Sequence, residues 1–305
     1  MRAAVVGVVG RLGRALVGAL EEAPFTGMRP PIGWDQPELE LDTVTAASFG
    51  VLLDRERPEV VVHTAAWTDV DGNAREPELA MRRNGTAVGE IARACAARGT
   101  DLLIISTNEV FDGARTDGRG YAPGDERHPI NPYGSAKAAA EQLASAAFAG
   151  SAGRLAIVRT AWLFGPPGND FPAKIAAAAV RAKASGQILR VTGDEIGTPT
   201  YTPDLAEAIV ELVGTDDPPP TGSVTIHHLV NGGRASRADW AREVLRTLDL
   251  DVEVVDVPAS TWPRASNPPL WAVLEPTPMP SGIPMRDWRD AFADAVPALR
   301  RGLTG

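Results

Sequence analysis

The sequence predicts an α/β fold in which helices cover both faces of a parallel sheet, with a smaller α/β lobe at the C-terminal end. Two observations support this class. Short apolar runs alternate with helical patterns over residues 1–160, as they do in successive β-α-β units. In addition, glycines directly follow the first apolar run, at the point where a strand would turn into a helix.

The expected strands of the N-terminal part are short apolar runs rich in Val, Ile, Leu and Ala. They comprise residues 3–9, a stretch that ends near Trp34 and Asp35, and residues 59–63, 101–106 and 155–160. The expected helices lie between them. They comprise residues 11–22, the Ala-rich residues 76–98 and the helix that carries Tyr133.

The pattern changes after residue 160. Residues 216–220 predict a loop, 223–230 a strand and 237–248 an amphipathic helix, whereas the proline-rich residues 262–284 predict an irregular connection. We therefore expect a nucleotide-binding domain over residues 1–160 and a substrate-binding lobe over residues 161–305, with an interleaved boundary.

Composition limits the classes of function. The 305 residues carry a formal net charge of −9 and a pI near 5.1, which argues against binding nucleic acid or a membrane surface by charge. The single Cys95 excludes an internal disulfide framework, so a reducing cytoplasm fits. Met1 leads directly into the first strand, and no apolar run reaches the roughly 18 residues that cross a bilayer. We expect neither a signal peptide nor a membrane span.

Three glycines mark the first turn. Gly7, Gly10 and Gly13 would permit a tight turn, close approach of the backbone to a pyrophosphate, and close helix–sheet packing. The spacing is GxxGxxG rather than GxGxxG, so a tightly packed turn that binds no nucleotide is the alternative. Their place after a buried strand favours a Rossmann-type doubly wound sheet that binds NAD(P).

Asp35 lies where an acid would accept a hydrogen bond from the adenosine ribose, which favours NADH; a solvated turn residue is the alternative. Arg11 could instead accept the 2′-phosphate of NADPH, and the choice between NADH and NADPH stays open. Further residues at the expected strand ends and glycine turn are candidates for cofactor contact. They are Leu12, Leu41, Asp42, Ala65 and Ala66.

Tyr133 and Lys137, four residues apart, share one face of a helix. Reduction of a ketone by hydride requires a proton donor and hydrogen-bond donors for the developing oxyanion. Tyr133 would be the acid, the Lys137 ammonium would lower its pKa, and both side chains could also contact the cofactor. Thr107, or less favourably Ser106, would donate to the ketone oxygen from the end of a strand. A Tyr-x-x-x-Lys spacing also occurs in helices by chance.

The chain resembles the extended short-chain dehydrogenase/reductases, nearest to the dTDP-4-dehydrorhamnose reductase branch. The segments that carry the resemblance run almost from end to end: GVVGRLGRAL, HTAAWTDVDGNAREPELAMRRN, STNEVFDG, NPYGSAKAAAE, RTAWLFGPPGNDF, GTPTYTPDLA and HHLVNGG. The resemblance implies that Thr107, Tyr133 and Lys137 are catalytic, and that Trp162 and Phe171 lie near the sugar. It also implies NAD(P)H-dependent reduction of a nucleotide-linked 4-keto-6-deoxysugar, and that Asn84 supports the active-site helix.

One segment departs from this branch, which reads STDYVFDG with an aromatic ring against the substrate. Here Asn108 and Glu109 stand in the middle of that segment, and both are candidates for sugar contact. Glu109 matches the Glu of nucleotide-sugar 4,6-dehydratases, whose segment reads STDEVYG. The alternatives are therefore a 4,6-dehydratase or epimerase that holds NAD tightly, and a non-catalytic dinucleotide-binding subunit.

Other residues carry weaker expectations. Arg264 could meet the diphosphate of a sugar nucleotide. The four histidines do not have the spacing of a metal site, so we predict no catalytic metal. The resemblance leaves the oligomeric state open between a monomer and a homodimer.

Overall fold

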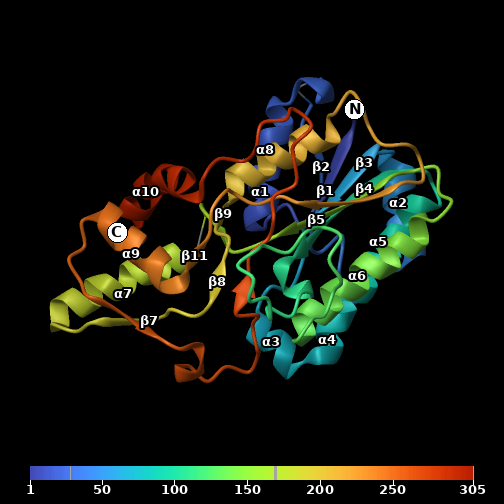
Figure 1. The fold of residues 1–305 in the computed structure, drawn as a ribbon. Coiled ribbons are helices and arrows are strands. Elements are labelled where there is room, and N and C mark those ends of the chain that lie inside the picture. Colours follow the sequence, from blue (N-terminus) through green and yellow to red (C-terminus); the bar gives the residue numbers. More distant parts are fainter. Residues whose placement is uncertain (28, 168–169, 305) are drawn as a thin grey trace.

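The computed structural model describes residues 1–27, 29–167 and 170–304 (Figure 1). Its centre is a six-stranded sheet in the order β10-β5-β4-β3-β1-β2, in which all neighbouring strands are parallel. The strands are β1 (Ala3–Val6), β2 (Ile32–Trp34), β3 (Val60–His63), β4 (Asp101–Thr107), β5 (Leu155–Thr160) and β10 (Val224–His228). This confirms the predicted Rossmann-type fold, and each strand expected between residues 3 and 160 is present.

Helices cover both faces of this sheet, because its strands are apolar on both sides (Figure 1). One face is covered by α2 (Ala46–Glu56), α5 (Ala87–Ala96) and α6 (Pro132–Phe148), around a core that includes Trp34, Phe49 and Phe148. The other face is covered by α1 (Arg11–Glu22) and α8 (Thr202–Val213), which pack on each other. Cys95 is free and buried on α5.

The helix expected over residues 76–98 differs from the prediction. It consists of α4 (Pro77–Met81), the π-helical turn η2 (Arg82–Thr86) and α5, and it follows the short α3 (Val70–Arg75). Pro77 begins α4 because a proline at the first helical position leaves no hydrogen bond unmade. The π turn packs on α6, where a Cβ on Gly85 would lie 3.1 Å from the carbonyl oxygen of Ala136.

The C-terminal lobe is built from helices and short strands (Figure 1). Its helices α7, α9 and α10 surround a core centred on Phe164, Trp240 and Phe292. The helices are α7 (Phe171–Ser185), α9 (Arg237–Leu248) and α10 (Trp288–Thr304), and the strands are β6 (Leu163–Phe164), β7 (Leu189–Thr192), β8 (Ile196–Gly197), β9 (Thr200–Tyr201), β11 (Ala235–Ser236), β12 (Val254–Val257) and β13 (Trp271–Ala272). The expected helix at 237–248 is present.

The chain crosses between the two parts more than once. Although β10 and α8 come after residue 160, β10 pairs with β5 at the edge of the central sheet and α8 covers one of its faces. The division into residues 1–160 and 161–305 stays a prediction. Over the described ranges, the structure contains no helix that is both long enough and apolar enough to traverse a bilayer.

Candidate active site

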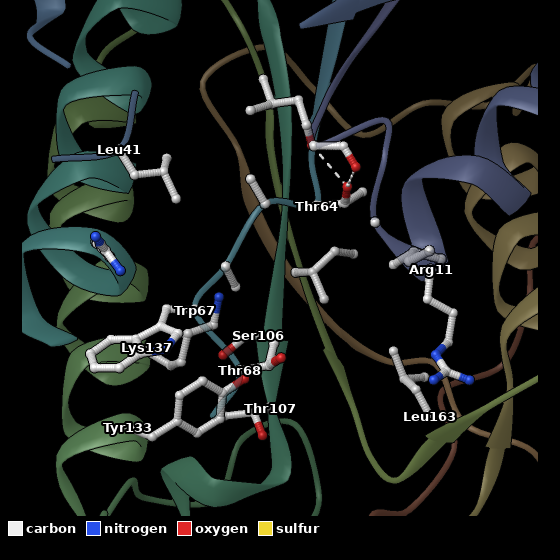
Figure 2. Close-up of a pocket in the computed structure, with 18 of the residues that line it drawn as sticks. Arg11, Leu41, Thr64, Trp67, Thr68, Ser106, Thr107, Tyr133, Lys137 and Leu163 are labelled. Atoms are coloured by element: carbon white, nitrogen blue, oxygen red, sulfur yellow. Dashed lines mark hydrogen bonds between the residues drawn. The ribbon is translucent and has the colours of Figure 1, made fainter. Parts of the chain in front are cut away.

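A cleft of about 720 Å³ lies at the carboxyl ends of β1, β3 and β4, where parallel sheets of this type bind ligands (Figure 2). The glycine turn after β1 forms one end of the cleft. The segment after β5, which leads into the C-terminal lobe, lines another part of it. The cleft brings together most of the site residues that the sequence predicts.

The glycine turn leaves room for a bound group because side chains are missing where backbones meet. Gly7 has a φ of +91°, and a Cβ there would lie 2.7 Å from the backbone nitrogen of Ala65. A Cβ on Gly13 would lie 2.0 Å from the carbonyl oxygen of Gly7. The start of α1 can therefore approach the cleft with free backbone N–H groups, which suits a pyrophosphate.

The cleft is lined by nine of the residues that the sequence predicts to contact the cofactor, which lie in this turn and after the neighbouring strands. They are Gly7, Gly10, Arg11, Leu12, Asp35, Leu41, Asp42, Ala65 and Ala66.

Two acidic residues, Asp35 and Asp42, line the cleft beyond the end of β2. The Asp35 carboxylate accepts hydrogen bonds from the backbone N–H groups of Val9 (3.1 Å) and Gln36 (2.9 Å), so it holds the glycine turn against the end of β2. The Asp42 carboxylate accepts two hydrogen bonds from Arg83, at 2.6 and 2.7 Å. The Arg83 bonds lower the pKa of Asp42. Asp35 and Asp42 thus both line the cleft, and Asp42 is already paired with Arg83.

The Arg11 side chain reaches toward Leu163, after β5 (Figure 2). Its guanidinium donates to the Asp170 carboxylate at 2.7 Å and to the backbone oxygen of Gly165. Both partners belong to the segment that leads into α7. The arginine that the sequence offered as a 2′-phosphate ligand is therefore engaged with the C-terminal lobe.

Thr107, Tyr133 and Lys137 meet in the cleft (Figure 2). Tyr133 and Lys137 project from the first two turns of α6, and Thr107 ends β4. The helix begins there because Pro132 occupies its first position and the Asn131 side chain caps it, accepting from the Gly134 N–H at 2.8 Å.

The environment of Tyr133 differs from the expectation. Burial raises the pKa of the phenol, the nearby negative charge of Glu109 raises it further, and a hydrogen bond with Thr107 opposes both effects. Tyr133 therefore keeps its proton at neutral pH, as a proton donor must.

Lys137 is almost fully buried, and burial lowers its pKa to about 8, although Glu141 one turn further on acts in the opposite direction. Glu141 is itself buried and pairs with Arg159 on β5, at 2.7 and 2.9 Å. The hydroxyl of Ser106 donates to the same carboxylate at 2.5 Å. Ser106 is thus committed to this buried pair, which leaves Thr107 as the hydroxyl beside Tyr133.

Asn84 is buried in the π turn and fixes the loop after β3. Its side chain accepts from the Trp67 N–H at 2.8 Å and donates to the Trp67 carbonyl at 2.9 Å and to Asn73 at 2.9 Å. Its hydrogen bonds therefore hold a wall of the cleft, whereas η2 as a whole supports α6 by packing.

The side of the cleft next to Tyr133 is lined by Asn108, Glu109 and Trp162, three of the predicted sugar-contacting residues. Trp162 has a left-handed φ of 45°, and its indole lies where a Cβ on Gly197 would be 2.5 Å away. Of the described residues, those that line the cleft do not include Phe171, which stacks on Trp240 at a ring distance of 4.8 Å.

Behind these residues lies a buried carboxylate, Glu195, between two partly buried arginines, and the sequence analysis missed both Glu195 and Arg237. Arg237, the first residue of α9, lies 3.5 Å above the Trp162 ring, and burial lowers its pKa to about 10. The carboxylate of Glu195 is buried between Arg237, at 3.6 Å, and Arg264. Arg264 therefore faces Glu195 and does not line the cleft. Glu195 and Arg237 belong to no motif, so the sequence alone gave no reason to single them out.

The described part of the chain holds no group of three or more His, Cys, Asp or Glu side chains placed to bind a metal. His63 and His228 are buried, and burial lowers their pKa values to about 3 and about 4.

A glycine turn after β1, a strand-end threonine and a Tyr-x-x-x-Lys helix around one cleft define the class of short-chain dehydrogenase/reductases. The sequence model described as "RmlD substrate binding domain" matches residues 1–301. The chain therefore belongs to this family, which confirms the resemblance to the extended, dTDP-4-dehydrorhamnose reductase-like branch.

The chain is also similar to individual proteins whose names agree with this family assignment. The chain is 38% identical over 245 residues to a dTDP-4-dehydrorhamnose reductase of Mycolicibacterium smegmatis, covering 79% of this chain and 71% of the relative. It is 34% identical to one of Streptomyces griseus, covering 97% and 93%. A solved structure of the Bacillus anthracis dTDP-4-dehydrorhamnose reductase in complex with NADP has a TM-score of 0.82 at 26% identity, covering 97% of this chain and 99% of that one.

Proposed function

We propose that the protein is an NAD(P)H-dependent reductase of a nucleotide-linked 4-keto-6-deoxysugar. The observation that carries the proposal is that Thr107, Tyr133 and Lys137 meet at one end of a cleft whose other end has the construction of a dinucleotide site. The names of the relatives, dTDP-4-dehydrorhamnose reductases, support the same reaction.

The cofactor end would hold NADH or NADPH through backbone and side-chain groups around the glycine turn. When bound, the reduced nicotinamide supplies the hydride that adds to the ketone carbon. The residues proposed to hold the cofactor are Gly7, Gly10, Arg11, Leu12, Gly13, Asp35, Leu41, Asp42, Ala65 and Ala66, together with Tyr133 and Lys137.

The chain's own part in the reaction is to deliver a proton to the ketone oxygen. Tyr133 keeps its proton until substrate arrives, because burial raises its pKa. The Thr107 hydroxyl can donate a second hydrogen bond to the same oxygen. As the proton leaves, the Lys137 ammonium offsets the negative charge that develops on the phenol.

Asn108, Glu109, Trp162, Phe171 and Arg264 are proposed to bind the sugar nucleotide. Asn108, Glu109 and Trp162 do so directly from the cleft wall. Phe171 would act through Arg237, which lies 5.2 Å from its ring. For Arg264 to bind the diphosphate, it would have to exchange its contact with Glu195 for one with phosphate. A homodimer and a cytoplasmic location remain further proposals from the sequence.

The test uses the purified protein, NADH or NADPH and a keto-sugar nucleotide. Reduced cofactor should be consumed only when the keto-sugar nucleotide is present, with one alcohol formed per cofactor oxidised. Tightly retained NAD that is never consumed would instead indicate the 4,6-dehydratase or epimerase alternative. Cofactor binding with neither activity would indicate the non-catalytic subunit.

A further inference from the structure

Glu109 presents a partly buried carboxylate to the cleft. One of its oxygens, Oε2, accepts a hydrogen bond from the Asn131 side chain at 2.7 Å. No side chain within the described ranges donates a hydrogen bond to the other oxygen, Oε1. A carboxylate with one oxygen fixed by the protein and one left free is a rigid hydrogen-bond acceptor.

The backbone of Glu109 lies directly beside the groups proposed to protonate the ketone, and its side chain lines the same cleft. The backbone N–H of Glu109 donates to the Thr107 hydroxyl at 3.2 Å. Its carbonyl oxygen packs so closely on α6 that a Cβ on Gly134 would lie 2.1 Å away. Its charge also raises the pKa of Tyr133. A substrate group that reaches Glu109 must therefore be attached close to the ketone carbon.

Burial raises the pKa of the Glu109 carboxyl, whereas the Asn131 hydrogen bond and the positive charges of Arg237 and Arg264 act in the opposite direction. The Glu195 carboxylate pairs with both Arg237 and Arg264. Together with Glu109, this makes two carboxylates and two guanidinium groups on this side of the cleft. Such a balanced group offers no excess negative charge to an ammonium ion. It does offer the free carboxylate oxygen to a neutral donor, whose hydrogen bond to a charged acceptor is strong.

We infer that Glu109 is a specificity-determining residue that accepts a hydrogen bond from a sugar hydroxyl on the carbon next to the ketone. The inference rests on the proposed function, because that substrate class fixes which carbon it is. In a 4-keto-6-deoxysugar, C5 carries hydrogen, a methyl group and the ring oxygen, none of which can donate a hydrogen bond to a carboxylate, whereas C3 can carry a hydroxyl. Glu109 thus selects sugars with a 3-hydroxyl over those with a 3-deoxy or a 3-amino centre.

A purely structural role for Glu109 makes a different prediction. Asn131 bonds to Glu109 and to the backbone oxygen of Asn267 (3.2 Å), and it caps α6. If Glu109 only holds Asn131, removing its carboxylate weakens the placement of Tyr133 and slows every substrate equally.

The experiment crosses enzyme variants with substrate analogues. We would measure kcat/KM of the wild type, Glu109→Ala and Asn131→Ala with a dTDP-4-keto-6-deoxysugar and its 3-deoxy and 3-amino analogues. The wild type should favour the 3-hydroxy sugar over the 3-deoxy sugar by roughly 10- to 100-fold, as expected for a hydrogen bond to a charged group. In Glu109→Ala that preference should shrink to within about threefold, because only the 3-hydroxy sugar loses a contact.

Asn131→Ala is the comparison variant: it removes the cap of α6 and the hydrogen bond that fixes Oε2, but it keeps the Glu109 carboxylate in the cleft wall. It should slow the 3-hydroxy and 3-deoxy sugars by similar factors and keep the preference. The inference is overturned if Glu109→Ala slows both sugars equally, if the wild type shows no preference, or if it prefers the 3-amino sugar.

A binding measurement separates this inference from the proposed reaction. Calorimetry would give Kd values for the non-reducible dTDP-6-deoxysugars with and without the 3-hydroxyl, for the wild type and Glu109→Ala. If the wild type reduces no ketone but binds the 3-hydroxy sugar more tightly, and Glu109→Ala does not, the proposed reaction fails and the inference stands. If neither sugar binds, both fail.

Discussion

The two ends of the cleft are built in different ways. At the end proposed to bind adenosine, the glycine turn, Asp35 and Asp42 come from the first 42 residues and follow β1 and β2 closely in the chain. The end proposed to bind the sugar is assembled from residues far apart in the chain: Thr107, Glu109 and Trp162 line it, and Asn131, which bonds to Glu109, also bonds to Asn267. Local spacing therefore encodes the first end, whereas tertiary packing creates the second.

The largest effect should come from removing the proposed proton donor, at the end of the cleft proposed to bind the sugar. Tyr133→Phe removes the proton donor and should lower kcat by roughly 100- to 10,000-fold, the range of general acid catalysis. Steady-state kinetics with a keto-sugar nucleotide measures this, and the Kd for NADH, followed by fluorescence, should change little. A variant that keeps wild-type turnover would remove Tyr133 from the mechanism.

The second-largest effect should come from a change in the glycine turn, at the end of the cleft proposed to bind adenosine. Gly7→Ala puts a methyl group 2.7 Å from the Ala65 backbone at a φ of +91°, so the turn must shift and the Kd for NADH should rise by about tenfold or more. Gly18→Ala on α1 is the control, because no atom lies within 4 Å of its added Cβ. It should bind NADH normally and raise the free energy of unfolding by about 0.5–1 kcal/mol.

The dependence of kcat/KM on pH tests the role of Lys137 at the end of the cleft proposed to bind the sugar. The pKa of Lys137 lies at about 8, so its ammonium is present below this pH and is lost above it. We expect kcat/KM to fall as the pH rises through about 8. Tyr133 keeps its proton in this range because its pKa is raised, so the fall reports Lys137.

Lys137→Arg is the corresponding control for the pH profile. Its guanidinium stays charged, so the variant should be slower but should lose the alkaline decline. An unchanged alkaline limb in this variant would assign the decline to another group.

The smallest expected effect concerns cofactor choice at the adenosine end. Asp35 and Glu40 line this end, and Arg83 is already paired with Asp42, so a 2′-phosphate would meet mainly negative charge. We expect kcat/KM to be roughly tenfold higher with NADH than with NADPH, and Asp35→Ser to narrow the ratio. An NADPH preference in the wild type would contradict this.

The same contrast explains what the sequence could predict. The sheet, the glycine turn and the Tyr133–Lys137 pair follow from local patterns of apolar residues and spacing, and the structure brings them together. Glu195 and Arg237 were not predicted, because their meeting with Arg264 depends on how β8, α9 and the proline-rich connection fold together. The π turn was missed for a similar reason, since its close approach to α6 is a tertiary contact.

Asp170 has a further consequence for how the molecule unfolds. Its carboxylate caps α7 through the Ala173 N–H at 3.0 Å, accepts from the Gly165 N–H at 2.9 Å and pairs with Arg11. A single side chain thus ties the beginning of α1 to the beginning of α7. Heating should therefore melt the sheet and the C-terminal lobe in one cooperative transition. Asp170→Ala should broaden it or split it in two in calorimetry, with about 1 kcal/mol lost from the helix cap alone.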